Sequence, residues 1–529
     1  MCLEGNQKCE RGYVMGFMNA LKNELVDGDT NVSITENGAV GYRTTGKNLL
    51  DLSFSVASLR SASEQEIVSR FQKAFFEDKI LAMKWLFFAR DVRGGLGERR
   101  LFRTAIKAVA DIDHTMVRKL VRLIPEYGRF DDLWVLLDDR EICPEIVDFV
   151  DSILNSDMTN CELGNPCSLL AKWMPSSNAS SQRTRHYAKV LRSGLGMSER
   201  GYRKMLSKLR RYLDVVEVKM SAKRWGDIRY EAVPSKANVI YNNAFLRNDE
   251  QRRREFLAKL EKGEAKINSA VLFPHDIVHM YSSGGCYWSV KKYDAAIEAM
   301  WKGLPDMVHG CGNTIVVADG SGSMNIRVGG SSVSALEVAN ALAIYFAEHS
   351  SGEFKNRYIT FSERPQFVSF DKAANLREKL MIARNHNECA NTNIEAVFDL
   401  ILNTAVKNGM KQEDLPANVL IISDMEFDAC TVSNSPSSYW HKGVNATLFG
   451  WIAERYAARG YKMPRLVFWN VNSRTGTIPV KENDMGVALV SGFSVNICKM
   501  VMSGKTDPFE CLLETLNSER YKPIEDALK

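Results

Sequence analysis

Residues able to hold a metal ion gather at the end of one apolar run. The segment DGSGS (319–323) follows the run TIVVAD (314–319) and puts a carboxylate and two hydroxyls on a single turn. Thr392 stands just before a predicted helix, and Asp424 ends a second apolar run, ANVLIISD. Oxygen donors of this kind suit Mg²⁺. The sequence therefore predicts Mg²⁺, or another divalent cation, at Asp319, Ser321, Ser323, Thr392 and Asp424.

A second group of residues could bind a polyanion. The formal net charge of the chain is +5, but residues 172–259 alone carry 21 Lys and Arg against 8 Asp and Glu. Phosphates attract such charge, and unpaired bases stack on aromatic rings and guanidinium planes. The alternative is a solvated helical surface whose aromatic residues pack in the core. The candidate RNA-binding residues are Lys172, Arg183, Arg185, His186, Arg203, Lys204, Lys208, Arg210, Arg211, Lys223 and Arg224.

The metal-binding candidates need strands to position them, and the second half of the chain provides the pattern. Apolar or alternating runs predict strands at 314–319, 356–362, 366–370, 417–424, 465–471 and 486–492. Amphipathic stretches at 334–349, 372–384 and 393–407 predict helices between them. Such alternation indicates an α/β doubly wound, Rossmann-like domain, in which ligands bind at the carboxyl ends of parallel strands.

The first half has a helical pattern instead. Helices are predicted at about 64–90, 98–109, 114–124, 130–138, 144–154, 198–213, 235–260 and 287–302, with 172–187 as a polar loop. Short helices joined by Gly and Pro turns are typical of an all-α solenoid or ring. We therefore expect a multidomain protein with an N-terminal arm (1–62) belonging to the helical module, the helical module itself (63–308), and the α/β domain (309–529).

The metal-binding candidates carry a resemblance to a known family. D-x-S-x-S at 319–323, followed by Thr392 and Asp424, is similar to the metal-ion-dependent adhesion site of the von Willebrand factor A domain. The resemblance covers about 310–500. It implies that Mg²⁺ there accepts an acidic group from a protein partner or acts structurally. The Thr loop departs from the usual glycine-rich form, since it reads ANTN (390–393).

The helical half also resembles a family. The stretches WLFFARDVRGGLGERRLF (85–102), IPEYGRFDDLW (124–134), LAKWMPS (170–176) and VPSKANVIYNNAFLRND (233–249) are similar to the Ro family and its TROVE module of HEAT-type helices. They look like an uncharacterised Ro-related group of phages, bacteria and plants. The resemblance implies binding of small structured or misfolded non-coding RNA, including its single-stranded ends.

Three function classes remain open. The favoured one is a monomeric ribonucleoprotein component that binds RNA without catalysis. The alternative is a metal-dependent protein-interaction or assembly module, possibly viral, with no RNA role. A nuclease is the third, and it would need further carboxylates such as Glu426 and Asp428. No Ser–His–Asp set can be assembled from the sequence, and His275 and His279 are expected to be packed or capping residues.

The composition indicates the class of protein and the compartment in which it is expected. Hydrophobic residues make up 45% and charged residues 25%, which is ordinary globular usage. No apolar run approaches a membrane span, and the N-terminus has no apolar signal core. Eleven cysteines stand at irregular spacings without a CxxC pair, as expected for reduced thiols. We expect a cytoplasmic protein with no membrane association.

Overall fold

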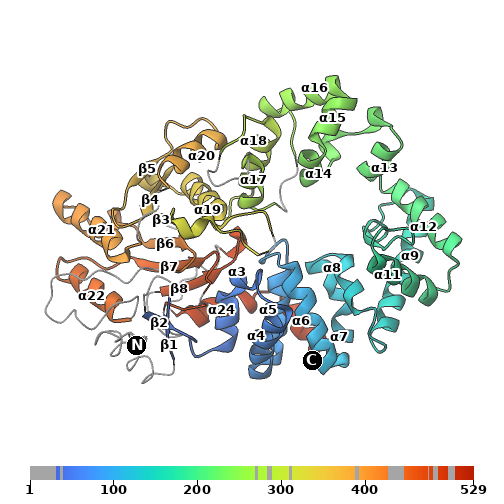
Figure 1. The fold of residues 1–529 in the computed structure, drawn as a ribbon, viewed down its shortest axis with the longest axis horizontal. Coiled ribbons are helices and arrows are strands. Elements are labelled where there is room, and N and C mark those ends of the chain that lie inside the picture. Colours follow the sequence, from blue (N-terminus) through green and yellow to red (C-terminus); the bar gives the residue numbers. More distant parts are fainter. Residues whose placement is uncertain are drawn as a thin grey trace, which may run out of the picture.

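The computed structural model describes most of the 529 residues. The described ranges are 31–35, 40–267, 272–282, 289–308, 313–329, 331–387, 392–426, 446–474, 476–479, 487–497 and 507–529. A helical region comes first and a mixed sheet with parallel strands follows it (Figure 1). None of the helices in these ranges combines the length and the apolar character needed to cross a lipid bilayer.

The helical region follows a short antiparallel hairpin of β1 (Val32–Ile34) and β2 (Val40–Tyr42). Its helices are α2 (Asn48–Phe54), α3 (Val56–Leu59), α4 (Glu64–Glu77), α5 (Lys79–Arg90), α6 (Arg99–Ile112), α7 (His114–Leu120), α8 (Ile124–Tyr127), α9 (Cys143–Leu163), α10 (Leu170–Trp173), α11 (Gln182–Gly194), α12 (Glu199–Tyr212), α13 (Val216–Ser221), α14 (Ser235–Ile240), α15 (Asn242–Asn248), α16 (Glu250–Glu261), α17 (Pro274–Tyr281) and α18 (Ala295–Lys302). The segment Phe130–Leu136 is a 3-10 helix.

Several helix predictions need correction; the one at 287–302, for example, begins only at Ala295 in α18. The stretch 64–90 is two helices, because the side chain of Asp78 accepts a hydrogen bond from the backbone N–H of Leu81 (2.9 Å) and starts α5 there. The expected helix 235–260 is divided into α14, α15 and α16. The predicted loop 172–187 contains the start of α11, where Ser181 caps the helix by accepting from Thr184 N–H. The density of serine and arginine in SSQRTR (180–185) concealed the start of α11.

The sheet has the order β5-β4-β3-β6-β7-β8. Its strands are β3 (Thr314–Asp319), β4 (Arg357–Phe361), β5 (Phe367–Ser369), β6 (Asn418–Ser423), β7 (Arg465–Asn470) and β8 (Val487–Ser491). All neighbouring pairs are parallel except β4 and β5. The six predicted strands are therefore confirmed.

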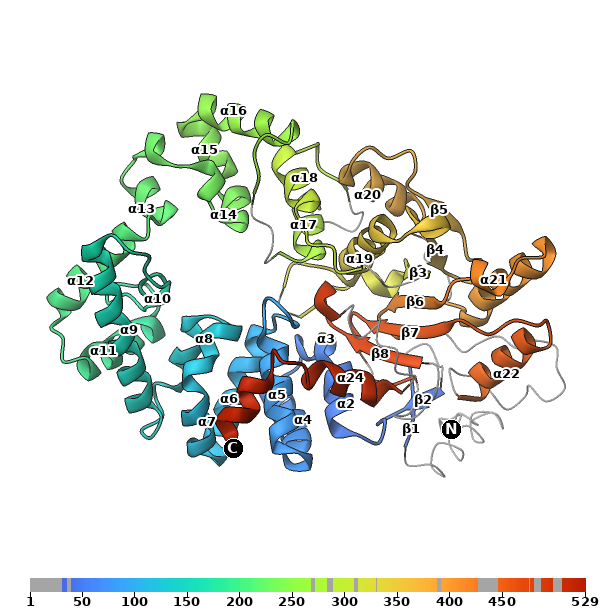
Figure 2. The same cartoon turned by 180° about the vertical axis from the view of Figure 1, so that it is seen from behind.

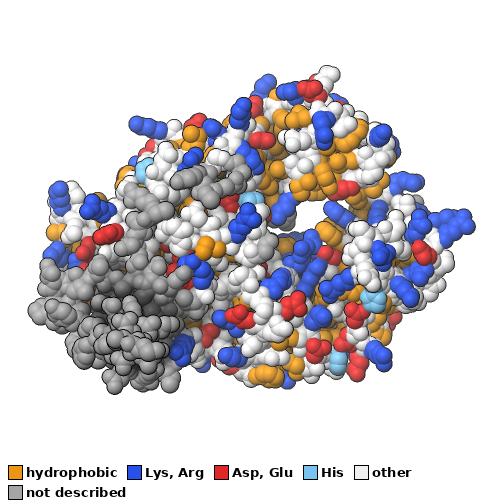
Figure 3. Space-filling model, viewed as in Figure 1, with side chains coloured by type: hydrophobic (Ala, Val, Ile, Leu, Met, Phe, Trp, Pro, Cys, Tyr) orange, Lys and Arg blue, Asp and Glu red, His pale blue; other side chains and the backbone are white. Residues whose placement is uncertain are grey.

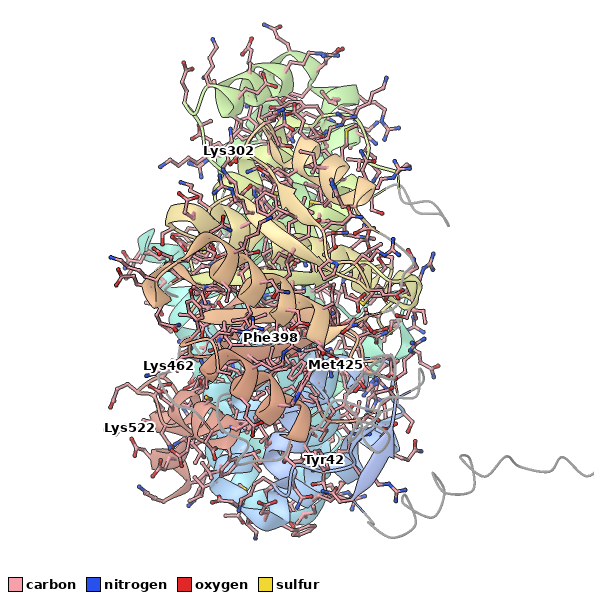
Figure 4. The ribbon with its side chains drawn as sticks, turned by 90° about the vertical axis from the view of Figure 1, so that its left-hand side faces the viewer. Tyr42, Lys302, Phe398, Met425, Lys462 and Lys522 are labelled. Carbon is pink, nitrogen blue, oxygen red and sulfur yellow. The ribbon has the colours of Figure 1, made fainter. Side chains whose placement is uncertain are left out.

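Helices cover both faces of this sheet. Alternate residues of β3 belong to different clusters: Val316 and Ala318 pack with α19 (Ala335–His349), whereas Ile315 and Val317 pack with α21 (Ile394–Asn408) and α22 (Ala446–Ala457). Figure 4 turns the side of the sheet that carries α21 and α22 toward the viewer. It labels Phe398 of α21 and Met425, which both belong to the same cluster as Ile315 and Val317. Another helix of this part, α20 (Leu376–Asn385), packs against α19.

The helices form a curved row, and both of its ends contact the sheet part (Figures 1 and 2). At one end α17 packs against α19. At the other, α2 lies against β8, and the side chain of Asn470 donates to the carbonyl of Phe54 (2.8 Å). The final helices, α24 (Pro508–Leu516) and α25 (Lys522–Leu528), return to pack on α5 and α7. Figure 3 shows the resulting opening through the molecule, with Lys and Arg side chains along its rim.

Candidate metal centre and basic cavities

The metal-binding candidate is built on the carboxyl end of β3. Asp319 is the last residue of that strand and is 2% exposed. Its Oδ1 accepts from the backbone N–H of Ser321 (2.9 Å), and its Oδ2 accepts from the hydroxyl of Ser423 on the neighbouring strand β6 (2.6 Å). The hydroxyls of Ser321 and Ser323 lie 2.9 Å apart. One tight loop therefore presents a carboxylate and two hydroxyls together, as the sequence predicts.

Asp424 brings a second carboxylate to the same place from the end of β6. It is 1% exposed, and its Oδ1 accepts from the backbone N–H of Glu426 (3.3 Å). Its Oδ2 makes no hydrogen bond to any described residue, although the guanidinium of Arg474 lies 3.6 Å away. Burial and the negative charge of Asp319 raise the pKa of Asp424 to about 7. Two buried carboxylates with one unsatisfied oxygen form an arrangement that a divalent cation would stabilise.

Thr392 comes from a third loop, the one that leads into α21. It is 6% exposed and stands two residues before α21 begins. Asn387, which follows α20, lies beside the β3 loop, since a Cβ on Gly320 would lie 3.0 Å from the Cα of Asn387. Ala390 and Asn391 of the same segment, and Asp428 after β6, lie outside the described residues.

The candidate residues therefore fit a metal ion that is bound by both carboxylate and hydroxyl oxygens. Within the described ranges, no group of three or more His, Cys, Asp and Glu side chains is placed to hold a metal ion. Asp319 and Asp424 supply two carboxylates, and further ligands would come from the hydroxyls of Ser321, Ser323 and Thr392. Glu426 is buried but accepts from the backbone N–H of Arg474 (2.7 Å), so one of its oxygens is already in use.

A large basic cavity opens in the helical region. Its volume is about 1720 Å³, and it is bounded by α4, α6, α10, α11 and α13. The cations that line it are Arg99, Arg100, Arg103, Lys107, Lys172, Arg183 and Arg210, and the carboxylates are Glu64, Asp111, Asp131 and Glu217. Rings also reach its wall, since Trp134, Trp173 and Tyr187 are among its lining residues.

A second cavity of about 800 Å³ shares Ser176, Arg210 and Val218 with the first. It is lined by α12 and by the loop that precedes α11. Its charged residues are all cations, namely Arg200, Arg203, Lys204, Arg210 and Arg211. The hydroxyls of Ser176, Ser177 and Ser207 and the amide of Asn178 add hydrogen-bonding groups. The two cavities together form a continuous basic surface.

The structure divides the eleven RNA-binding candidates into two sets. Lys172, Arg183, Arg203, Lys204, Arg210 and Arg211 line the cavities. The other five do not appear among the lining residues, and most are engaged locally. Arg185 donates to the carbonyls of Ala179 and Ser180 (2.8 Å each), His186 pairs with Asp138 (2.6 Å), Lys208 with Glu162 (3.0 Å) and Arg224 with Asp227 (3.5 Å). Lys223 is exposed.

Arg210 has a structural role in the helical region. Its guanidinium donates to the carbonyls of Ala171 (2.8 Å) and Met174 (2.7 Å) and to the hydroxyl of Ser176 (2.8 Å). Burial lowers its pKa. Arg210 therefore fixes the segment from Ala171 to Ser176, which borders both cavities, while it also lines both of them.

Sequence reasoning missed the cations of α6. Arg99, Arg103 and Lys107 are four residues apart, so they share one face of the helix. Burial and the charges of Arg129 and Arg103 lower the pKa of Arg99. Cations held close enough to repel one another favour a bound anion. The signal was present in RRLFRTAIK, but these residues lie outside the net-basic block.

The two histidines in HDIVH do not share a site. His275 is buried, with its ring stacked on Phe273 and edge-on to Phe493 (5.7 and 5.1 Å between centroids). Burial lowers its pKa to about 4. His279 instead contacts Glu337 and Ser332 in the sheet part. The expectation of a packed or capping pair is therefore confirmed for His275.

Comparison with known proteins shows which family the chain belongs to. Residues 167–313 match the family described as Domain of unknown function (DUF2828), and residues 313–523 match the one described as Domain of unknown function (DUF7788). The chain is also 31% identical over 543 residues to the "Uncharacterized protein L728" of Acanthamoeba polyphaga mimivirus, covering 93% of this chain and 89% of that protein. Because this similarity extends over nearly the full length of both chains, the protein belongs to the same family as mimivirus L728.

Proposed function

We propose that the protein binds RNA on the continuous basic surface formed by the two cavities. The observation that carries the proposal is the second cavity, where Arg200, Arg203, Lys204 and Arg211 face a common space without a lining carboxylate. A surface of this kind attracts a phosphate backbone and releases its counterions. The half-buried Trp173 in the adjoining cavity adds an indole plane on which an unpaired base can stack.

The fold supports the same proposal. A curved row of helices that meets the sheet part at both ends suits a TROVE-like solenoid closed into a ring. The strand order, with one antiparallel edge strand β5, suits a von Willebrand A domain. RNA with an accessible single-stranded segment is the ligand expected, since a ring with a basic inner surface admits one strand more readily than a duplex. Small non-coding RNA meets this description.

Fluorescence anisotropy with labelled RNA tests the proposal. The triple variant Arg203→Glu, Lys204→Glu and Arg211→Glu should lose affinity for a single-stranded RNA. Its plot of log K against log salt should be shallower by about 2, since each lost phosphate contact removes about 0.7. The matched control is Lys259→Glu, Lys262→Glu and Lys302→Glu, with the same charge change at exposed positions on α16, directly after it and on α18 (Lys302 is labelled in Figure 4).

Two outcomes would contradict RNA binding on this surface. One is a wild-type protein that ignores both structured and single-stranded RNA at low salt. The other is a control variant that loses as much affinity as the cavity variant, because binding would then follow net charge alone. Retention of affinity in the control, with loss in the cavity variant, supports a specific surface.

A second candidate function rests on the unsatisfied Oδ2 of Asp424. We propose that Asp319, Ser321, Ser323, Thr392 and Asp424 hold Mg²⁺. The bound ion would supply a Lewis-acid position for an acidic group of a protein partner, as in metal-dependent interaction or assembly modules. This function is compatible with RNA binding, since the carboxyl ends of β3 and β6 and the basic cavities are built from different elements.

A further inference from the structure

A serine, a histidine and a glutamate are linked by consecutive hydrogen bonds where the helical region meets the sheet part. The hydroxyl of Ser332 is 2.8 Å from Nε2 of His279. Nδ1 of the same ring is 3.1 Å from Oε1 and 3.2 Å from Oε2 of Glu337. His279 comes from α17 in the helical region, whereas Ser332 and Glu337 flank the start of α19. Fifty-three and 58 residues separate His279 from its two partners.

The direction of these hydrogen bonds follows from Glu337. Its side chain is 3% exposed, and hydrogen bonds from His279, Ser282 and the backbone of Ser334 outweigh burial and hold its pKa at about 2. An ionised carboxylate only accepts, so Nδ1 of His279 is the donor toward it. In the neutral ring Nε2 then carries the lone pair, and the hydroxyl of Ser332 donates to it. This is the polarity of a serine activated by a histidine base.

Helix capping accounts for only part of the arrangement. Glu337 and Ser334 form a capping box, in which Ser334 N–H donates to Oε2 (2.7 Å) and Glu337 N–H donates to the Ser334 hydroxyl (3.2 Å). That box requires neither His279 nor Ser332. Ser332 is exposed and His279 is 33% exposed, so both are open to a ligand from solvent. The backbone N–H of Ser332 donates to no described residue and could meet a developing oxyanion.

We propose that Ser332, His279 and Glu337 form a nucleophile, a base and a positioning carboxylate that together cleave carboxylic esters. Ser332 Oγ bonds to the ester carbonyl carbon while its proton passes to Nε2 of His279. The carbon–oxygen bond to the alcohol then breaks, and the alcohol leaves with that proton. Water, the second substrate, attacks the acyl-serine and gives a proton to Nε2. The carboxylic acid departs as Ser332 regains its proton. Glu337 keeps Nδ1 protonated and stabilises the imidazolium throughout.

This activity goes beyond RNA binding and does not depend on it. The sequence predicts a protein that binds without catalysis. It could not reveal the triad, because no local sequence motif contains the three residues. The open setting of Ser332 favours small esters whose carbonyl can approach from solvent. Longer acyl chains would need an enclosed wall beside the serine.

Labelling of the full-length protein with a fluorophosphonate probe, followed by intact mass and peptide mapping, tests the proposal. Wild type should gain one adduct, on Ser332, and should hydrolyse p-nitrophenyl acetate. Ser332→Ala should lose both, and His279→Gln should slow labelling about 100-fold or more. The matched control is Ser331→Ala, since the Ser331 hydroxyl donates to the carbonyl of Val328 (2.6 Å) and has no such base as a partner among the described residues. That variant should label at the wild-type rate.

Glu337 needs a readout that a packing role would not change. Glu337→Gln should slow labelling at every pH between 6 and 9, and Glu337→Asp should restore part of the rate. Circular dichroism and thermal melting establish that each variant is folded. A folded wild type that the probe does not label, or that labels equally after Ser332→Ala, would overturn the proposal. So would a His279→Gln variant that labels at the full rate.

Discussion

The guanidinium of Arg520 donates two hydrogen bonds to the carboxylate of Asp91, 429 residues away in the chain. Asp91 follows α5 and is fully buried, and the hydroxyl of Tyr521 donates to the same carboxylate (3.1 Å). Nearby, Lys84 pairs with Glu525 of α25 (3.0 Å). The last helices of the chain are therefore fastened to the first helices of the curved row. The sheet lies between these segments in sequence, so this contact helps to close the molecule.

Removing Arg520 should destabilise the protein. Arg520→Ala leaves the fully buried Asp91 without its cation, and a buried charged group that loses its partner costs about 1–3 kcal/mol or more. Urea denaturation followed by far-UV circular dichroism measures the free energy of unfolding. Lys522→Ala is the control, since that exposed lysine makes a 3.8 Å pair with the exposed Glu519 and should change stability by less than about 1 kcal/mol. Equal effects of the two variants would show that Asp91 does not depend on Arg520.

Substitutions of Arg99 and Arg103 should differ in their effect on stability, although both should weaken RNA binding. Arg103 pairs with Asp131 (2.9 Å) and the fully buried Asp132 (2.7 Å), so Arg103→Gln should lose stability as well as RNA affinity. Arg99 is held near other cations, and burial and their charges lower its pKa. Arg99→Gln should therefore weaken RNA binding several-fold and reduce the salt slope by about 0.7, with unchanged stability. Thermal melting and RNA anisotropy on both variants check this, and a loss of stability in Arg99→Gln would contradict it.

Mg²⁺ should stabilise the protein through Asp424. At a concentration of 100 Kd, a ligand bound only by the folded state adds about 2.7 kcal/mol to the free energy of unfolding. Asp424→Asn should abolish this effect, because a neutral amide is a poor cation ligand at an already buried position. Without metal the variant should be at least as stable as wild type, since it removes repulsion with Asp319. Asp371→Asn, at an exposed carboxylate after β5, should keep the Mg²⁺ effect. Isothermal titration with MgCl₂ provides a direct measurement.

His275 should make stability fall in mild acid. Burial lowers its folded-state pKa to about 4, against about 6.5 in the unfolded chain. Between these values the unfolded state binds a proton that the folded state does not, so stability is complete above about pH 6.5 and is lost as the pH falls toward 4. The loss from this group is roughly 3 kcal/mol. His275→Phe, which keeps a ring between Phe273 and Phe493, should remove that part of the pH dependence. Parallel pH profiles for the two proteins would contradict the assignment.

The sequence by itself determined the local elements and the metal-binding candidates. The apolar runs became β3, β6, β7 and β8 because a strand buried on both faces needs an apolar residue at almost every position, whereas the edge strand β5 alternates between exposed and buried residues. The DGSGS loop follows β3 for the same reason, since the strand must end where small and polar residues begin. Asp319 and Asp424 could then be placed at one edge, because parallel strands of one sheet end on the same side.

Only the tertiary structure decided which charged residues share a space. A run of cations shows its charge in the sequence but not its partners. Arg203 faces a cavity, Arg210 is bound to backbone carbonyls about two helix turns later in α12, and Arg99 joins them from a helix about a hundred residues earlier. Ser332 with His279, and Asp91 with Arg520, were likewise invisible in the sequence. Local periodicity specifies which face of an element is buried. Contacts between distant elements depend on how those faces pack together, which no local pattern records.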